Sequence, residues 1–339
     1  MGAHFVETKV TNLDDVDFPR FKLLISEVIR SYNGYTQWSY RSRDRNSSLN
    51  LGLRYNYLEK FSKSIVEPRV TFTQQFLEHF SFELAGEFKH QTTSQVINFQ
   101  NDFLGVEKRR WQLSNDETIP VITSKQGSVG FNFSNAGWLM SLEGYYKMVE
   151  GITTQSQGFQ DQYEFVKTDG SYEVVGADVL LRKRIKNANF WLSYAFMNND
   201  YTFDALPEKT FPSNLDITHT ITFGSTFKYK GLSLSGGLNW HTGKPTTLPR
   251  TVQEISSNSV SYEDSNSSRL DDYMRVDFSA LYDIKWDKVT LQAGVSVWNV
   301  LDETNVIGNY YRLNAEGLPS EFVQNSLGLT TNAVLRCYF

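Results

Sequence analysis

Apolar and polar side chains alternate with a period of two along most of the chain. The last stretch, GLTTNAVLRCYF, shows the pattern clearly. Thr331, Ala333, Leu335, Cys337 and Phe339 fall on one side of an extended chain, and Asn332, Val334, Arg336 and Tyr338 fall on the other. This period is typical of a β-strand whose two faces meet different surroundings.

The alternation recurs often enough to predict an all-β protein with about thirteen long strands. Many runs exceed the ~5–6 residues of an ordinary globular strand and reach the ~9–11 residues that cross a bilayer at a tilt. The predicted strands lie near residues 37–42, 48–57, 66–75, 80–90, 126–134, 138–148, 172–185, 189–202, 216–229, 231–244, 270–284, 288–300 and 327–339.

The connections between these strands alternate between short and long. Short polar turns lie at 75–79, 134–137, 186–189, 228–231 and 284–288. Segments rich in Asn, Asp, Ser, Thr and Gly lie at 92–124, 149–170, 202–215, 246–268 and 301–326. Such long loops count against a compact soluble domain, whereas outer-membrane barrels have short periplasmic turns and long extracellular loops. We therefore expect a transmembrane antiparallel β-barrel.

An odd number of strands cannot close into an all-antiparallel barrel, because the first and last strands would run parallel. Bacterial barrels have even strand numbers, and an open sheet edge cannot face lipid. Two explanations stay open: a further strand within 2–10 or 22–30, or a chain that is the C-terminal portion of a larger barrel. Residues 1–35 stay unassigned, as a loop or partial strand, and we assign 36–339 to the barrel.

Composition agrees with this fold class. The chain is 14% aromatic with a mean hydropathy of −0.41, and it has no run of ~20 apolar residues for a helical span. A barrel tolerates a polar average because half of each strand faces water, although a soluble β-sandwich fits too. The net charge of −5 argues against a nucleic-acid partner, whose binders carry basic patches.

The start and the cysteine content add two expectations. MGAHFVETKV has no basic segment followed by an apolar one, so it is not a secretory signal. An outer-membrane protein would need such a signal, which favours a missing N-terminal region. Cys337 is the single cysteine, so no intrachain disulfide can form.

Catalytic and metal-binding patterns are not found. The sequence has no nucleophile elbow, HExxH, phosphate loop or dinucleotide fingerprint. Its five histidines show no metal-ligand spacing, and the acidic residues 263–264 and 271–272 fit a solvated loop better than a cation site. We expect no enzymatic activity, no cofactor and no bound metal.

Several segments together resemble a known family. They are LNLGLRYNYLEKFSKSIVEPRVTF (49–72), ADVLLRKRIKNANFWLSYAF (177–196), FPSNLDITHTITFGSTFKY (211–229), GGLNWHTGKPTT (236–247), RLDDYMRVDFSALYDI (269–284), VSVWNVLDETN (295–305) and SLGLTTNAVLRCYF (326–339). In order and spacing the chain resembles the C-terminal barrel portion of a TonB-dependent outer-membrane receptor, of the type common in Bacteroidetes-like bacteria. One departure is Leu329-Thr330-Thr331-Asn332, where the family often has a proline.

The resemblance implies a closed barrel of about 22 strands in the bacterial outer membrane, with a plug in its lumen. It implies import of a scarce nutrient, such as an iron chelate, cobalamin or a glycan. The expected partners are outer-membrane lipid, a plug and early strands from the missing N-terminal region, a periplasmic TonB-type coupling protein reached through that region, and the barrel-assembly machinery. In this family a terminal aromatic residue, here Phe339, is the assembly signal.

Candidate site residues fall into three groups. Polar residues expected to face the lumen are Arg54, Arg69, Glu143, Arg182 and Arg184. The favoured interpretation is that they are plain water-facing side chains of the barrel interior, because the alternation requires polar residues there in any case. Loop aromatics that could hold a ligand are Trp111, Tyr163, Phe165, Tyr262, Tyr310 and Tyr311. Aromatics at strand ends that fit a membrane-interface girdle are Trp138, Trp191, Trp240, Trp286 and Tyr57.

Two other functions remain open on the sequence. A self-contained porin would let small solutes diffuse without a plug, and a surface adhesin would use its long loops to bind a partner protein.

Overall fold

One antiparallel sheet dominates the computed structural model, which describes residues 1–17, 20–97, 109–115, 117–157, 163, 166–251, 260–287 and 289–339. The sheet has 15 strands. Its main path runs through β1 (Gly2–Val16), β2 (Phe21–Arg41), β3 (Ser47–Leu58), β4 (Lys63–Phe76), β5 (Phe80–Gln91), β8 (Ile122–Asn135), β9 (Trp138–Thr153), β10 (Asp169–Ile185), β11 (Ala188–Thr202), β13 (His219–Tyr229), β14 (Leu232–His241), β17 (Tyr273–Lys285), β18 (Thr290–Trp298) and β21 (Thr330–Tyr338). The fifteenth strand, β12 (Thr210–Pro212), pairs with β11.

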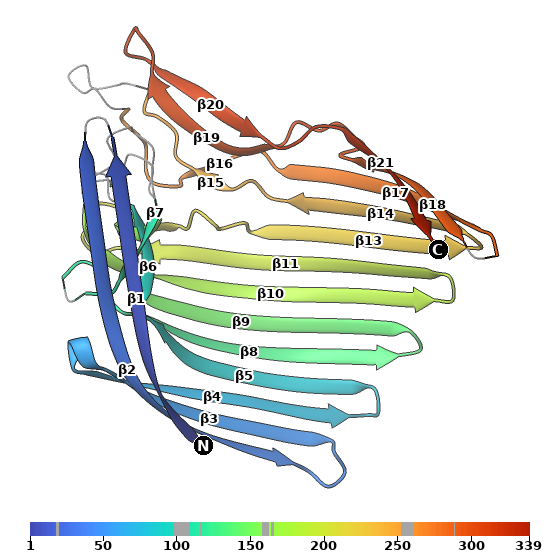
Figure 1. The fold of residues 1–339 in the computed structure, drawn as a ribbon, viewed down its shortest axis with the longest axis horizontal. Helices are drawn as coiled ribbons and strands as arrows, with labels where there is room; N and C mark the ends of the chain where they lie inside the picture. Colours follow the sequence, from blue (N-terminus) through green and yellow to red (C-terminus); the bar gives the residue numbers. More distant parts are fainter. Residues whose placement is uncertain are drawn as a thin grey trace.

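The strands follow one another in the sheet in the same order as in the sequence (Figure 1). Every strand range predicted from the alternation overlaps a strand of this path. Neighbours in sequence pair as antiparallel hairpins, for example β10 with β11 from Ser171↔Thr202 to Ile185↔Ala188. The all-β antiparallel fold predicted from the sequence is confirmed.

Within residues 1–35, Gly2–Val16 form β1 and residues 21–35 belong to β2. These two strands pair along their lengths, from Gly2↔Tyr35 to Val16↔Phe21. The main path therefore starts one strand earlier than the alternation indicated, and its first and last strands run in opposite directions.

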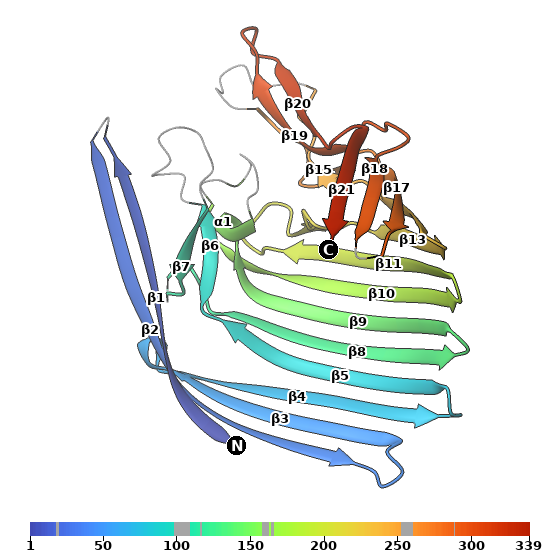
Figure 2. The same ribbon diagram turned by 45° about the vertical axis from the view of Figure 1, so that its right-hand side comes forward.

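The two outer strands of the sheet have one neighbour each. Among the described residues β1 pairs with β2 alone and β21 with β18 alone. The sheet curves like part of a barrel wall, with β1 and β21 well apart (Figure 2). Their outer edges carry unpaired backbone groups, which lipid cannot satisfy.

Short turns and long connections lie at opposite ends of the strands (Figure 1). Short turns of two to five residues span 42–46, 77–79, 136–137, 186–187, 230–231 and 286–289. The connections at the other end begin with two short ones, 17–20 and 59–62, the second of which contains the 3-10 turn η1 (Glu59–Phe61). The remaining connections at this end are long and span 92–121, 154–168, 203–218, 242–272 and 299–329. These long connections contain β6 (Thr93–Ile97), β7 (Arg109–Leu113), α1 (Thr154–Gln157), β15 (Pro245–Thr246), β16 (Ser268–Arg269), β19 (Val306–Leu313) and β20 (Pro319–Asn325). We call this end of the sheet the loop end.

The turn between β8 and β9 shows how the hairpins close in two residues. Ala136 and Gly137 both have positive φ, at 47° and 79°. Two positive φ values are the mark of a type I′ turn, whose twist matches that of the flanking strands. A Cβ on Gly137 would lie 2.5 Å from the Arg184 carbonyl oxygen, so no other residue fits there without a shift.

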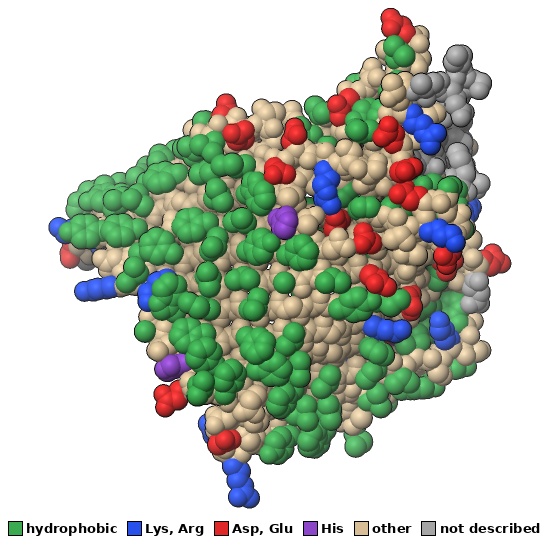
Figure 3. Space-filling model, turned by 180° about the vertical axis from the view of Figure 1, so that it is seen from behind, with side chains coloured by type: hydrophobic (Ala, Val, Ile, Leu, Met, Phe, Trp, Pro, Cys, Tyr) green, Lys and Arg blue, Asp and Glu red, His purple; other side chains and the backbone are tan. Residues whose placement is uncertain are grey.

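The pairing register sorts side chains onto two different faces, because residues directly opposite each other share a face. One face is apolar, although its side chains are exposed: Leu142 is 49% exposed and Leu335 is 72% exposed. Other members of this apolar face are Trp38, Leu51, Val70, Leu84, Val129, Val175, Leu192, Phe223, Phe278 and Val295. Figure 3 shows hydrophobic side chains spread over this face, with charged side chains mostly towards the loop end and along the edges. So large an apolar surface is suited to lipid and not to water.

The opposite face, called the polar face below, carries hydrogen-bonded rows across the strands. Arg336 Nη1 donates to Gln292 Oε1 at 2.8 Å, and Gln292 Nε2 donates to Asp283 Oδ1 at 2.8 Å. These three residues are directly opposite one another on β21, β18 and β17. The alternation of GLTTNAVLRCYF thus corresponds to Leu335 on the apolar face and Arg336 on the polar face.

The buried core lies beneath the loops rather than between two layers of sheet. Its buried members are Val149, Ile152, Tyr201, Phe203, Leu206 and Phe211, with Ile122, Tyr163 and Tyr172 packed against them. Phe203 is 0% exposed, so the connection between β11 and β13 is anchored by apolar packing. No helix among the described residues is long and apolar enough to cross a membrane.

The two-faced sheet generates a stability prediction. Leu142→Arg places a guanidinium on the apolar face, and we expect a loss of about 2–4 kcal/mol in unfolding free energy if this face meets the middle of a bilayer. Urea unfolding of the protein in lipid vesicles measures the change. Glu143→Arg is the matched control, since the next residue lies on the polar face opposite Asp178. Equal losses in the two variants would contradict the assignment of the faces.

Candidate functional site

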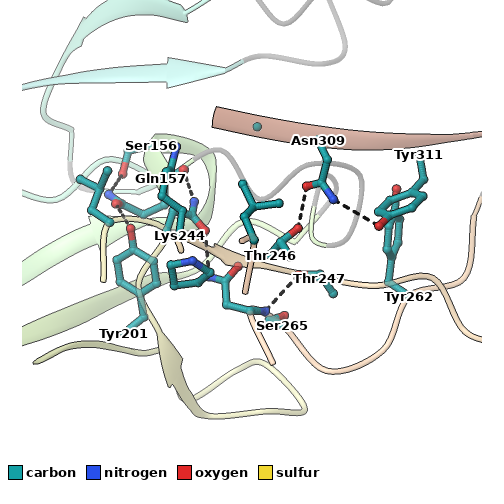
Figure 4. Close-up of a pocket in the computed structure, with 16 residues that line it drawn as sticks. Ser156, Gln157, Tyr201, Lys244, Thr246, Thr247, Tyr262, Ser265, Asn309 and Tyr311 are labelled. Atoms are coloured by element: carbon teal, nitrogen blue, oxygen red, sulfur yellow. Dashed lines mark hydrogen bonds between the residues drawn. The ribbon is translucent and has the colours of Figure 1, made fainter. Parts of the chain in front are cut away.

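A pocket lies at the loop end, where four of the long connections converge. Its cavity has a volume of about 360 Å³. The lining residues come from the connections 154–168, 203–218, 242–272 and 299–329 and from the end of β11 (Figure 4). They are Ser156, Gln157, Tyr201, Asn214, Leu215, Lys244, Pro245, Thr246, Thr247, Tyr262, Ser265, Asn266, Leu270, Gly308, Asn309 and Tyr311.

The first wall of the pocket joins α1 to β11. The hydroxyl of Tyr201 donates to Gln157 Oε1 at 2.8 Å, and Asn214 Nδ2 donates to the Gln157 carbonyl oxygen at 3.1 Å. The Tyr201 ring belongs to the buried core and packs against Phe211, with ring centroids 5.8 Å apart. The apolar core therefore fixes the position of a polar group at the pocket surface.

The second wall is formed by the connection between β14 and β17. The backbone N–H of Asn266 donates to Thr247 Oγ1 at 3.0 Å. Its side-chain Nδ2 donates to the Pro212 carbonyl oxygen at 2.7 Å and to Asn214 Oδ1 at 2.8 Å. Asn266 thus ties this connection to the one between β11 and β13, and it is 8% exposed.

The third wall is one face of the β19–β20 hairpin. Thr246 Oγ1 donates to Asn309 Oδ1 at 2.7 Å, and Asn309 Nδ2 donates to the Tyr311 hydroxyl at 3.2 Å. The Tyr311 hydroxyl in turn donates to Glu321 Oε1 at 3.1 Å. The Tyr262 and Tyr311 rings meet edge to face, with centroids 6.3 Å apart.

An ion pair with a buried carboxylate holds two of these connections together. Arg269 Nη1 donates to the carbonyl oxygens of Asp216 at 2.6 Å and of Gly243 at 3.1 Å, and Arg269 Nη2 is paired with the Asp216 carboxylate. The other oxygen of that carboxylate accepts the backbone N–H of Asn199 at 2.9 Å. Asp216 is 2% exposed. The Arg269 side chain is 37% exposed, so the buried partner is the Asp216 carboxylate. Removing Arg269 would leave that buried charge without its counter-ion, and the pair therefore fixes the geometry of the two connections.

Neutral hydrogen-bonding groups dominate the pocket. Among its described lining residues, the ammonium of Lys244 is the only charged group at neutral pH. Burial raises the pKa of Tyr311 to about 12, and the hydrogen bond to Glu321 acts in the same direction, so the phenol stays protonated. Burial also raises the pKa of Glu208, whose carboxylate accepts the Ser265 N–H at 2.8 Å, and nearby Asp264 adds to the rise.

The structure brings three of the predicted loop aromatics to this pocket. Tyr262 and Tyr311 line it. Tyr163 lies directly behind, where its hydroxyl accepts a hydrogen bond from Ser265 Oγ at 3.0 Å.

The other predicted loop aromatics are not in the pocket. Tyr310 is on the opposite face of the β19–β20 hairpin, stacked on Phe322 at 5.2 Å. Trp111 is half-exposed on β7, and its carbonyl oxygen accepts a hydrogen bond from Asn12 at 2.7 Å. Phe165 lies outside the described residues.

The register places all five predicted lumen-facing residues on the polar face of the sheet. They are Arg54, Arg69, Glu143, Arg182 and Arg184. Arg54 Nη2 lies 2.8 Å from His4 Nε2, and Arg69 Nε lies 3.9 Å from Glu87 Oε2. Among the described residues, no three His, Cys, Asp or Glu side chains gather in a group that could hold a metal ion.

The structure corrects one assignment to the aromatic girdle. Trp138 and Trp240 lie on the apolar face, but Trp191 lies on the polar face with its indole over Gly224. The reason is the period of two: Phe190 and Leu192 occupy the apolar face, so the residue between them must point the other way.

Most of the polar pocket residues carry no signal in the sequence. Gln157, Asn214, Thr246, Asn266 and Asn309 lie in connections rich in such residues, without periodicity or motif. Only the convergence of four connections distinguishes them from ordinary loop residues. The density of Asn, Ser and Thr indicated polar loops, but not which members meet.

Comparison with known proteins identifies the family. A family model described as TonB dependent receptor-like, beta-barrel, matches residues 10–296. No curated protein sequence matches the chain.

Solved structures of outer-membrane receptors share the fold. The ferric yersiniabactin uptake receptor of Yersinia pestis matches with a TM-score of 0.65 at 9% identity, covering 99% of this chain and 50% of that one. The FrpB iron transporter of Neisseria meningitidis matches with a TM-score of 0.60 at 11% identity, covering 93% and 46%. The ferripyoverdine receptor of Pseudomonas aeruginosa matches with a TM-score of 0.59 at 16% identity, covering 93% and 39%.

The chain therefore spans half or less of the length of these three receptors. At such low identity the likeness shows the fold and not the ligand. The family match covers most of the chain, and the solved receptors share its antiparallel sheet. The chain belongs to the β-barrel family of the TonB-dependent receptors, which are non-enzymatic transport proteins of the bacterial outer membrane.

Proposed function

We propose that this chain is the C-terminal barrel portion of a receptor that imports a scarce nutrient across the outer membrane, of the type common in Bacteroidetes-like bacteria. The observation that carries the proposal is the polar pocket at the loop end, which is lined by residues of four connections. These connections join strands whose apolar face is suited to lipid. Ligand sites are commonly concave and built from loops on a rigid scaffold. An iron chelate, a cobalamin or a glycan is the expected class of cargo.

The unpaired edges support a larger barrel. The outer edges of β1 and β21 need partners in lipid, and the chain spans about half the length of receptors with this fold. An N-terminal region would supply the further strands and the plug of the complete receptor. The same region would contact the periplasmic TonB-type protein. The polar-face residues Arg54, Arg69, Glu143, Arg182 and Arg184 are then available to contact the plug through hydrogen bonds and ion pairs.

The test of import is growth under limitation. A strain without the receptor should fail to grow when its cargo is the limiting iron, cobalamin or carbon source, and so should a strain without the coupling protein. A panel of ferric chelates, cobalamin and oligosaccharides as the limiting nutrient identifies the class. Normal growth of both strains on the whole panel would refute active import, and loss in the receptor strain alone would favour passive diffusion.

The orientation of the barrel gives a second prediction. An epitope tag inserted between residues 250 and 265 should be labelled by antibody on intact cells, whereas a tag at 229–231 should be labelled only after the outer membrane is opened. The physical basis is that long connections lie outside and short turns face the periplasm. The reverse labelling would invert the assigned topology.

The C-terminus gives a third prediction. Phe339 follows β21 directly and is 99% exposed, so it makes little packing contribution of its own. If it is the signal for the barrel-assembly machinery, deleting it should lower the amount of receptor in the outer membrane at least severalfold. Immunoblots of membrane fractions measure this. Leu329→Ala, at a half-exposed position just before β21, is the control. Equal amounts of wild type and deletion variant in the membrane would contradict the assigned role.

A further inference from the structure

We propose that the pocket at the loop end takes a neutral, polyhydroxylated ligand, such as an oligosaccharide, in preference to an anionic metal chelate. This inference rests on the proposed receptor function and specifies its cargo. It follows from three properties of the described lining: the kind of hydrogen-bonding groups, the sign of the surrounding charge and the arrangement of the tyrosines.

Hydroxyl and amide groups form most of the lining. Seven of the sixteen residues bear hydroxyls (Ser156, Tyr201, Thr246, Thr247, Tyr262, Ser265 and Tyr311), and four bear amides (Gln157, Asn214, Asn266 and Asn309). Each such group can donate and accept. A ligand hydroxyl also does both, so a polyol can replace the water on this surface bond for bond. A carboxylate or catecholate oxygen only accepts, and would leave half of the capacity of these groups unused.

Hydrogen bonds within the protein fix the positions of several of these hydroxyl and amide groups, all of which are neutral. The Asn309 amide accepts a hydrogen bond from the Thr246 hydroxyl at 2.7 Å and donates one to the Tyr311 hydroxyl at 3.2 Å. Gln157 is held by the Tyr201 hydroxyl at 2.8 Å. A polar site whose groups are fixed before binding loses less conformational entropy when the ligand arrives.

The charges around the pocket disfavour an anion. Glu321 accepts hydrogen bonds from Asn309 at 2.8 Å and from Tyr311 at 3.1 Å, and Glu208 accepts one from Ser265. Two carboxylates thus lie behind three lining residues, and the carboxylate of Asp264 lies near that of Glu208. The positive groups are the ammonium of Lys244 in the lining and the guanidinium of Arg250, whose Nε donates to the Tyr262 carbonyl oxygen at 2.8 Å. Ferric complexes of carboxylates and catecholates carry net negative charge, and like charges near a low-dielectric pocket repel. A neutral ligand avoids this cost.

The tyrosines offer flat apolar surfaces among the polar groups. Tyr262 and Tyr311 meet at an interplanar angle of 69°, so their two ring faces point in different directions. A sugar ring has apolar C–H groups on its faces and hydroxyl groups around its edge. Such a ring can pack on an aromatic face while its hydroxyls bond to neighbouring amides. The cavity of about 360 Å³ is within the usual range of about 300–1,000 Å³ for ligand pockets.

The β19–β20 hairpin supplies a matched pair of variants. Tyr311 faces the pocket, whereas its neighbour Tyr310 faces away and stacks on Phe322. Both are tyrosines on the same strand, so Tyr311→Ala and Tyr310→Ala make the same chemical change on opposite faces. A ligand in this pocket should distinguish them.

The experiment is calorimetric titration of the complete receptor, purified from outer membranes in detergent, with three kinds of probe. These are neutral maltose-, cellulose-, xylose- and mannose-type oligosaccharides, ferric citrate, and cyanocobalamin. We expect saturable binding of at least one oligosaccharide series and none of ferric citrate. Tyr311→Ala should weaken that binding at least about tenfold, through a lost hydrogen bond and a lost ring face. Tyr310→Ala should change it less than about twofold.

Salt dependence supplies a readout that folding defects would not imitate. Binding of a neutral ligand should vary less than about twofold between roughly 0.05 and 0.5 M NaCl, since there is no ligand charge to screen. Circular dichroism and the amount extracted from membranes check that both variants are assembled.

The inference is overturned if ferric citrate or cyanocobalamin binds and the oligosaccharides do not, if no probe binds, or if the two tyrosine variants are affected equally. Binding to purified receptor needs no energy source. Oligosaccharide binding without coupled uptake would therefore refute the proposed import alone, whereas coupled uptake of an anionic chelate would refute this inference alone.

Discussion

The structure depends on one constraint: each backbone N–H and C=O of a strand in lipid needs a partner on a neighbouring strand. The antiparallel meander meets it by pairing strands that follow one another in sequence, from β1–β2 to β18–β21. Pairing keeps the backbone extended, and an extended backbone directs alternate side chains to opposite faces. The apolar face, the polar face and the short turns all follow from this arrangement.

The ladder also determines where the buried core can be. A single curved sheet with lipid on one face has no second sheet to pack against, so its apolar side chains remain exposed within the isolated chain. The buried cluster instead sits beneath the loops, around Phe203 and Phe211. Because Tyr201 belongs to that cluster and also lines the pocket, the same packing that orders the loops positions the polar groups above them.

Strands were predictable where lipid and water meet the two faces, because the period of two is then written in each segment. The first strand was less visible for a specific reason. Beyond Phe5 its apolar-side positions hold Glu7 and Lys9, and Glu7 pairs with Arg30 on β2 at 2.9 Å. A hairpin that extends past the apolar band loses the contrast between its faces, so only its pairing with β2 defines it.

The sequence by itself determined the fold class, nearly every strand and the division into turns and loops, since these depend on side chains close together in the chain. Tertiary structure decided which loop residues meet. Asn214, Thr246, Asn266 and Asn309 come from three connections, and the Asp216–Arg269 pair that holds two of them spans 53 residues. Tertiary structure also decided that Tyr311 lines the pocket while Tyr310 lies on the opposite face of the hairpin. Contacts between loops depend on the curvature of the whole sheet, which no local pattern encodes.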